Sequence, residues 1–501
     1  MAFYPILCTF FLFIFMVLRI WKKSKTNHSN PNLPPGPWKL PLIGSIHHLV
    51  GSLPHLRLSD LARKHGPLMH LQLGELTNIV VSSPEIAKQV MKTNDTNFSH
   101  RPYLVAASIA TYNYSDIAFA PYGDYWRQMR KICMLELLTA KRVKSFRSIR
   151  EEEVSKLIRS LTSSCGEGSL INLSKMVNAM TYSIISRAAF GKIWKGEEIF
   201  IPTAKKLLEG SEGFTLADMY PSVKLLHWSN MVRKLKELQG IADNIYQNII
   251  DDHRSRRAAE AKSRTYDEED FVDVLLNCQE QGDLPIPITD DNIKGVLADT
   301  FIAGSETSST TIEWAMSELV KDPKVMEKAQ EEVRRVFAAQ GNVDESRIQE
   351  LTYLNMVIKE TLRLHPPLPL LVPRECGENC VINGYDIPAK SKVIVNAWAI
   401  GRDPNYWNDA DQFCAERFQD CSIDYKGTNF EFLPFGAGRR ICPGMLFGIS
   451  NVEFPLAQLL YHFDWKLPSG VKPETLDMEE AFGAVAKRKK DLHLLPTLYI
   501  T

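Results

Sequence analysis

One short segment of the sequence joins a cysteine, two arginines and several glycines in a pattern suited to holding a thiolate. It runs Phe435-Gly-Ala-Gly-Arg-Arg-Ile-Cys-Pro-Gly444 and has the spacing F-x-x-G-x-R-x-C-x-G. Such a loop wraps a thiolate, because its glycines let backbone N–H groups approach the sulfur of Cys442. With Arg440 nearby, these donors are expected to keep the thiol of Cys442 deprotonated. The alternative is an ordinary turn with a buried free cysteine.

A second polar motif lies inside an apolar, helix-periodic stretch from about residue 290 to residue 320. There the sequence runs Ala303-Gly-Ser-Glu-Thr-Ser308. A threonine hydroxyl can bond back to an earlier carbonyl and bend a helix, which leaves room for water. An acid beside an alcohol, here Glu306 beside Thr307, makes a short proton relay. The alternative is a solvated helix face.

Several charged residues carry weaker signals. Glu360 and Arg363 are three apart, so they share one helical face and can pair. Trp126 and Arg130 are four apart on another predicted helix. Arginine suits carboxylate recognition because its planar fork donates two parallel hydrogen bonds. Each of these residues, taken alone, is more typical of a surface helix.

Composition excludes some classes of protein. Among the 501 residues, 59 Lys and Arg balance 59 Asp and Glu, so the net charge gives no indication of nucleic-acid binding. The nine cysteines are scattered without a C-x-x-C pair. Cys376 and Cys380 are four apart but have no second pair or histidine cluster beside them. We therefore expect neither a disulfide framework nor a zinc site.

The N-terminal residues predict the compartment. Residues 2–18 are almost entirely apolar, and the first basic residues follow them. This length is the lower limit for crossing a bilayer, and the stretch lacks the cleavage site of a signal peptide. We predict a retained membrane anchor at residues 1–21, with the rest of the chain on the cytosolic side. Residues 22–45 are predicted to form a polar and proline-rich linker or hinge.

Residues 46–501 are predicted to form one catalytic domain, mainly α with a minor β-sheet. Helical patterns fill the middle of this region, and strand patterns occur at residues 68–73, 78–82 and 392–396. The charged segment 253–269 is predicted to be a surface loop.

The motifs together resemble the cytochrome P-450 family, and they do so in order along nearly the whole chain. The resemblance implies a cytochrome P-450 fold with a single N-terminal transmembrane helix. It also implies heme b, with Cys442 as the axial iron ligand within a loop that includes Phe435 and Gly444. The resemblance assigns the heme propionates to basic and aromatic residues: Trp126, Arg130, Arg374 and Arg440.

Other roles follow from the same resemblance. Glu306 and Thr307 would supply protons for oxygen activation, with Glu306 where Asp is more usual. Glu360, Arg363 and Arg417 would form a buried structural cluster, although Ala415 stands where the family usually has proline. Substrate would contact four mostly apolar segments: 105–119, 297–304, 368–372 and 482–485.

The amino-acid sequences of the proline-rich segment and of the cysteine loop are similar to those of plant microsomal members of the family, especially terpenoid-oxidising ones. This implies a monooxygenase of the endoplasmic reticulum membrane that inserts one oxygen atom from O2 into a C–H bond of a hydrophobic metabolite. Electrons would come from NADPH through a separate NADPH-cytochrome P-450 reductase, because no nucleotide-binding glycine loop is found. The alternatives are an alkaloid or phenolic hydroxylase, a heme-thiolate isomerase or dehydratase that needs no reductase, and a non-catalytic heme sensor.

Overall fold

The computed structural model describes residues 31–165, 169–192, 197–209, 215–259 and 269–499. The predicted anchor at residues 1–21 and the first part of the predicted linker lie outside these ranges. Among the helices within them, none combines the length and the apolar character that a bilayer crossing requires. The division at residues 21 and 45 stays a prediction.

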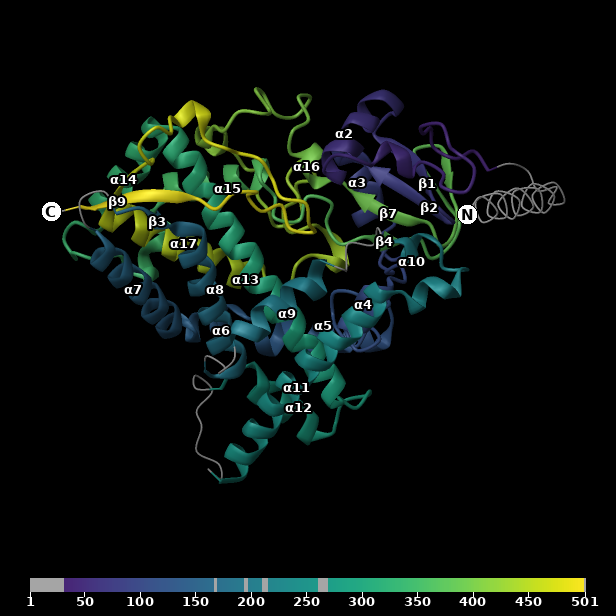
Figure 1. The fold of residues 1–501 in the computed structure, drawn as a ribbon, viewed down its shortest axis with the longest axis horizontal. Coiled ribbons are helices and arrows are strands. Elements are labelled where there is room, and N and C mark those ends of the chain that lie inside the picture. Colours follow the sequence, from purple (N-terminus) through teal and green to yellow (C-terminus); the bar gives the residue numbers. More distant parts are fainter. Residues whose placement is uncertain (1–30, 166–168, 193–196, 210–214, 260–268, 500–501) are drawn as a thin grey trace, which may run out of the picture.

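Helices dominate the described part of the chain, as predicted (Figure 1). The α-helices are α2 (Pro54–His65), α3 (Pro84–Lys88), α4 (Val105–Ala110), α5 (Asp124–Ile132), α6 (Ala140–Ser145), α7 (Arg147–Ser164), α8 (Leu173–Phe190), α9 (Glu197–Glu209), α10 (Leu216–Met219), α11 (Asn230–Ala259), α12 (Phe271–Gln281), α13 (Asp290–Lys321), α14 (Pro323–Phe337), α15 (Thr352–Leu364), α16 (Ala397–Ile400) and α17 (Met445–His462). Short 3-10 turns include η7 (Glu345–Glu350), η8 (Ala415–Phe418) and η9 (Gly438–Arg440).

The strands form small sheets. They are β1 (Leu68–Leu73), β2 (Leu76–Val81), β3 (Ile171–Asn172), β4 (Arg374–Glu375), β5 (Cys380–Ile382), β6 (Tyr385–Ile387), β7 (Lys392–Val395), β8 (Phe463–Lys466) and β9 (His493–Leu498). The largest sheet has the order β1-β2-β7-β4, with β2 and β7 parallel. The three predicted strands are confirmed as β1, β2 and β7.

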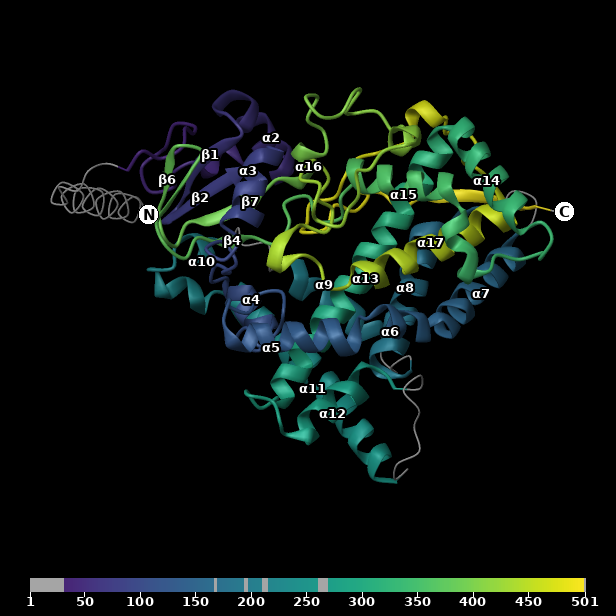
Figure 2. The same cartoon turned by 180° about the vertical axis from the view of Figure 1, so that it is seen from behind.

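The long helix α13 is the central element. Thr289 caps its first turn, and its side chain and that of Asn292 bond each other's backbone N–H groups in a capping box. The helix then continues for 32 residues, most of them buried, packed against α8 and α17. In Figures 1 and 2 it passes through the middle of the molecule, between the β1-β2-β7-β4 sheet on one side and α14 and α17 on the other.

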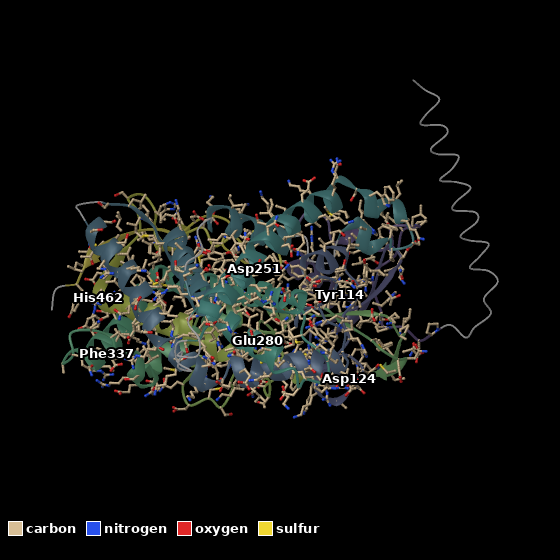
Figure 3. All side chains as sticks on the ribbon, turned by 90° about the horizontal axis from the view of Figure 1, so that it is seen from below. Tyr114, Asp124, Asp251, Glu280, Phe337 and His462 are labelled. Atoms are coloured by element: carbon tan, nitrogen blue, oxygen red, sulfur yellow. The ribbon has the colours of Figure 1, made fainter. Side chains whose placement is uncertain are left out.

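Figure 3 shows the molecule from below, with the end that carries α14 and α17 and the end that carries the sheet. Phe337 and His462, at the ends of α14 and α17, mark one end, whereas Tyr114 and Asp124 lie toward the other. α13 therefore connects the helical end of the molecule to the part that carries the sheet.

The prediction of a surface loop at 253–269 was wrong for its first residues. Residues 253–259 continue α11, and residues 260–268 lie outside the described ranges. Charge alone did not prevent helix formation, because ion pairs satisfy the side chains. Arg254 pairs with Asp290 at 2.6 Å, and Arg257 pairs with Glu280 at 2.8 Å.

Candidate active site

The cysteine loop is held in shape by its glycines. Gly436 and Gly438 have φ angles of 69° and 70°, in the left-handed region that disfavours other residues. A Cβ atom on Gly438 would also lie 2.1 Å from the main-chain oxygen of Met91. The loop then turns back, so that the N–H of Cys442 donates to the carbonyl of Phe435 at 3.0 Å. The backbone path thus requires Gly436 and Gly438, whereas Gly444 has a φ of −89° and open space where a Cβ would lie.

The electrostatics of the Cys442 thiol differ from the expectation. Burial raises its pKa, which favours the protonated thiol; the N–H of Gly444 and the charge of Arg130 act in the opposite direction. The nearby arginine that lowers this pKa is therefore Arg130, and Arg440, named from the sequence, has no such effect. Without iron the loop does not by itself keep the sulfur ionised, because desolvation outweighs its donors. A bound metal ion deprotonates a coordinating thiol.

Cys442 lines a cavity between α17 and α13. Phe435 and Gly444 line it beside the cysteine, and Ala303, Gly304 and Thr307 line it from α13. Thr307 donates its hydroxyl to the carbonyl of Ala303 at 2.7 Å, the back-bond that was predicted. Gly304 is explained by packing, because a Cβ there would lie 2.9 Å from the Ile185 side chain of α8. The cavity thus brings the predicted ligand and the predicted relay threonine together.

Four arginines line the same cavity: Arg101, Arg130, Arg374 and Arg440. Arg374 pairs with Asp95 at 3.2 Å and bonds the carbonyl of Ala437 at 2.8 Å. The other three, among the described residues, donate to main-chain carbonyl oxygens. Arg440 bonds those of Ser99, Ile117 and Ala120, and Arg130 bonds that of Ile441.

The acids beside this cluster offset only part of its positive charge: Asp116 acts on Arg101 and Arg440, and Asp299 acts on Arg101. Burial lowers the pKa of Arg440 to about 9, helped by the charges of Arg374 and Arg130. Burial also lowers the pKa of Arg130 and of Arg101. A ligand with carboxylates would neutralise these cations, and heme carries two propionates. The residues present therefore fit a heme with its propionates toward the arginines and its iron toward Cys442.

Trp126 supports this wall of the cavity. Its ring N–H donates to the carbonyl of Ile117 at 3.0 Å, and the guanidinium of Arg440 lies 4.2 Å from its ring centroid.

Arg101 was not identified from the sequence. It bonds the carbonyls of Ala118, Val372 and Pro373, which join two predicted substrate segments. No motif surrounds it in the sequence, so only the tertiary contacts identify it.

Glu306 is almost fully buried, with 1% of its side chain exposed, and its carboxylate has three partners. The hydroxyl of Tyr182 donates to it, the ammonium of Lys205 lies at 3.3 Å, and that of Lys487 forms a closer contact. Both lysine side chains are 34% exposed. Glu306 is therefore connected to solvent through charged groups that sequence spacing did not indicate.

A second, mostly apolar cavity adjoins the first, and the two share Ala303 and Thr307 in their walls. It is lined from all four predicted substrate segments: Ala110, Thr111, Ala118 and Phe119; Ala298, Asp299, Ile302 and Ala303; Leu368 to Val372; and Gly483 to Val485. Glu306 also reaches this wall. Phe482 does not line it and is 65% exposed.

The predicted structural cluster is assembled and buried. Arg363 donates to both carboxylate oxygens of Glu360 at 2.7 Å, and both side chains are fully inaccessible. Arg417 lies 3.3 Å from the same carboxylate. Ala415 begins η8 and is fully buried, so alanine in place of proline leaves Arg417 in position.

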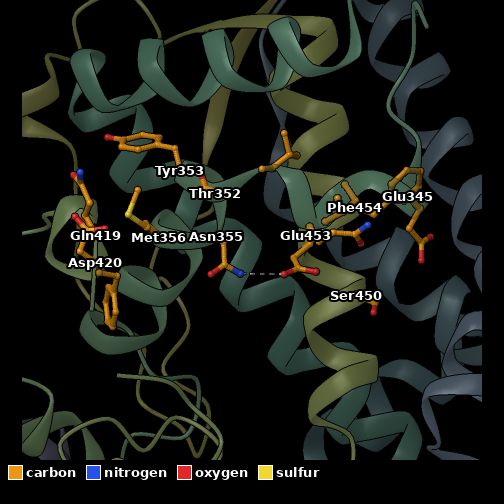
Figure 4. Close-up of a pocket in the computed structure, with 14 residues that line it drawn as sticks. Glu345, Thr352, Tyr353, Asn355, Met356, Gln419, Asp420, Ser450, Glu453 and Phe454 are labelled. Atoms are coloured by element: carbon orange, nitrogen blue, oxygen red, sulfur yellow. Dashed lines mark hydrogen bonds between the residues drawn. The ribbon is translucent and has the colours of Figure 1, made fainter. Parts of the chain in front are cut away.

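A larger cavity lies elsewhere. It has a volume of about 860 Å3 and is lined by polar and apolar side chains of η7, α15 and α17 and of the residues at the end of η8 (Figure 4). Asn355 donates to Glu453 there at 3.4 Å. None of the predicted catalytic or heme-binding residues lines it. Its size alone therefore does not make it the active site.

A helical fold around a cysteine loop and an arginine-rich cavity defines a heme-thiolate type of protein. The sequence model of the family described as Cytochrome P450 matches residues 34–495. The chain therefore belongs to the cytochrome P450 family, and membership implies a heme iron.

Two relatives and one solved structure illustrate the likeness. Desmethyl-deoxy-podophyllotoxin synthase of Sinopodophyllum hexandrum is 54% identical over 489 residues, covering 97% of this chain and 96% of the relative. Premnaspirodiene oxygenase of Hyoscyamus muticus is 52% identical over 501 residues, covering 100% and 99%. A zebra fish cytochrome P450 solved with progesterone superimposes with a TM-score of 0.77 at 26% identity, over 89% of this chain and 100% of that chain. With such relatives, the chain is a cytochrome P450 monooxygenase.

Proposed function

We propose that this monooxygenase hydroxylates a terpenoid, with Cys442 as the iron ligand and electrons delivered from NADPH by a separate cytochrome P450 reductase. The observation that carries the proposal is the pair of adjoining cavities. One contains the cysteine and the arginines, the other is apolar, and Thr307 borders both. A substrate in the apolar cavity would lie beside the heme.

Bound heme iron would supply the activation of O2. The chain's own residues orient the cofactor and control water and protons. Arg101, Arg130, Arg374 and Arg440 would hold the propionates, and the buried Glu360–Arg363–Arg417 cluster would stabilise the core behind the heme loop. Thr307 presents its hydroxyl at the boundary of the cavities, and Glu306 would pass protons to it from the lysines that reach solvent.

The substrate class rests on two supports. The lining of the second cavity is mostly apolar, which suits a hydrophobic substrate with few polar groups. A similar protein, premnaspirodiene oxygenase, is named for a terpenoid. Desmethyl-deoxy-podophyllotoxin synthase is slightly more similar, at 54% identity against 52%, so other classes of hydrophobic metabolite, alkaloids and phenolics among them, belong in the test.

We also propose attachment to the endoplasmic reticulum membrane through residues 1–21. Two groups of exposed apolar side chains support an orientation against a membrane. One lies within the proline-rich segment (Trp38, Leu40, Ile43) and the other lies between α10 and α11 (Val223, Leu225, Trp228). The hydroxyl of Tyr220 donates to the carbonyl of Leu42 at 3.3 Å, so the two groups are neighbours.

The test is product formation in microsomes that contain the full chain and a plant reductase. Sesquiterpenes, diterpenes, alkaloids and phenolics are supplied with and without NADPH, and a carbon monoxide difference spectrum is recorded. A terpenoid product that gains one oxygen only with NADPH supports the proposal. A product that forms without NADPH would indicate an isomerase or dehydratase, and oxidation of only phenolics or alkaloids would overturn the terpenoid assignment.

A further inference from the structure

Two thiols outside the active site lie in contact beside the larger sheet. The sulfur atoms of Cys376 and Cys380 are 3.9 Å apart. Cys376 directly follows β4, and Cys380 begins β5, so the loop 377–379 joins them. Cys376 is fully buried, whereas Cys380 is partly accessible to solvent. Spacing in the sequence gave no reason to pair them, but the loop turns back and brings them together.

The loop is fixed in the conformation that makes this contact. Asn97 accepts the N–H of Gly377 at its main-chain oxygen (2.8 Å) and that of Glu378 at its side-chain oxygen (2.7 Å). Its amide donates in turn to the carbonyl of Glu378 at 3.0 Å and faces the Cys376 sulfur at 3.6 Å. A bonded S–S distance is about 2.05 Å. To close the remaining gap, the Cys376 thiol must give up its hydrogen bond to the carbonyl of Glu378 at 3.0 Å and turn toward Cys380.

We propose that Cys376 and Cys380 form a redox-modification site, at which a hydroperoxide oxidises the two thiols to an intramolecular disulfide. The sulfur of Cys380 attacks the O–O bond of hydrogen peroxide, takes up one hydroxyl and releases water, which leaves a sulfenic acid. The sulfur of Cys376 then attacks that of Cys380, forming the S–S bond and releasing the second water. The two thiols lose two electrons, which reduce one peroxide to two waters.

The order of the two thiols follows from their surroundings. Cys380 reaches solvent, so peroxide meets it first. Burial raises the pKa of both thiols; that of Cys376 rises to about 12, whereas hydrogen bonds from Cys376 and Asn97 oppose the increase at Cys380. Cys376 therefore acts as the resolving thiol. A monooxygenase whose turnover fails to insert oxygen releases hydrogen peroxide, so the oxidant arises at the same protein.

The sequence offers a direct assay. Trypsin cleaves after Arg374 and Lys390, so the peptide 375–390 contains both cysteines and no internal Lys or Arg. The peptide 418–426 contains Cys421 alone, a half-buried cysteine that serves as the internal reference. Heme-loaded full-length protein in microsomes is titrated with hydrogen peroxide below the dose that changes the carbon monoxide difference spectrum. It is then denatured, alkylated and digested for mass spectrometry.

The expected result is a peptide 375–390 that carries no alkyl group and has lost two hydrogens, at a peroxide dose that leaves Cys421 alkylated, because the adjacent Cys376 traps the sulfenic acid of Cys380. Dithiothreitol before alkylation should restore the doubly alkylated peptide. In Cys380→Ser, Cys376 should stay reduced at that dose, because its partner is missing. The proposal is overturned if the peptide keeps both alkyl groups while Cys421 oxidises, or if Cys376 is oxidised equally in Cys380→Ser.

Discussion

Lys205 of α9 places its ammonium nitrogen 3.3 Å from a carboxylate oxygen of Glu306 of α13. The lysine is about one-third exposed and the glutamate is buried, so the pair connects the protein surface to the wall of the apolar cavity. Lys487 approaches the same carboxylate from the C-terminal segment. On its solvent side, the proposed acid Glu306 is therefore in contact with two lysines. On its cavity side, it is adjacent to Thr307.

Replacing Glu306 by Gln should slow product formation by at least about tenfold, since the proposed proton path loses its ionisable inner group. The solvent deuterium isotope effect on product formation should increase in the variant. Glu313→Gln is the control, because Glu313 is also buried on α13 but bonds Ser174 and lines neither cavity. Equal loss in both variants would show that the effect is structural.

Thr307→Ala should lower the amount of product formed per NADPH several-fold and release hydrogen peroxide instead, because the hydroxyl at the boundary of the cavities is lost. Product and peroxide are measured in the same reaction. Thr310→Ala removes a buried hydroxyl of the same helix that lines neither cavity, and its coupling should match the unaltered protein. An unchanged product-to-NADPH ratio in Thr307→Ala would refute the relay.

Arg363→Ala should destabilise the fold by about 3–5 kcal/mol, because it strands the Glu360 carboxylate in the core. Thermal loss of the carbon monoxide difference spectrum measures this. Arg347→Ala is matched in spacing, since Arg347 pairs with Glu350 three residues away, but that pair is 34% and 44% exposed. Its loss should be much smaller, because a solvent-exposed ion pair contributes little to stability. Similar losses in both variants would contradict the argument from burial.

Glu453 should make stability depend on pH. Burial raises its pKa from 4.5 to about 7, opposed by Asn355 and aided by Glu345. A raised carboxyl pKa means that the folded state holds the proton more tightly. The contribution of the Glu453 carboxyl to the free energy of unfolding is therefore complete below pH 4.5. It is lost as the pH rises through 7. Glu453→Gln should therefore gain up to about 3 kcal/mol relative to the unaltered protein at pH 8, and little at pH 5. Melting temperatures at the two pH values test this, and a gain of equal size at both would be inconsistent with it.

Arg101→Gln should reduce the heme-to-protein ratio by about half or more, because one of the four cations that line the cavity and would hold the propionates is lost. Arg101→Lys keeps the charge and should recover part of the heme. Arg335→Gln, at an exposed position, is the control. If Lys and Gln lower the ratio equally, the role of Arg101 lies only in its hydrogen bonds to Ala118, Val372 and Pro373.

Much of the site could be predicted from the sequence, because its geometry depends on residues that are close to one another along the chain. Gly436 and Gly438 are needed for the turn that leads to Cys442, and the Thr307 back-bond spans one helical turn. The i to i+3 spacing of Glu360 and Arg363 pairs them on any helix. The strands at 68–73 and 392–396 and the long helix from residue 290 were predicted for the same reason, since periodicity is a local property.

Only the tertiary structure decided which groups meet across long separations. It placed Arg101 among the arginines of the cavity, brought Lys205 and Lys487 to Glu306, and made Arg130 the charge that acts on the Cys442 thiol. It also turned the charged residues 253–259 into helix by pairing them with distant acids. The sequence by itself determined the cysteine loop, the relay motif and the mainly helical family fold, because short-range geometry specifies them. The charge balance, burial and cavity walls depend on packing between segments hundreds of residues apart, which no local pattern encodes.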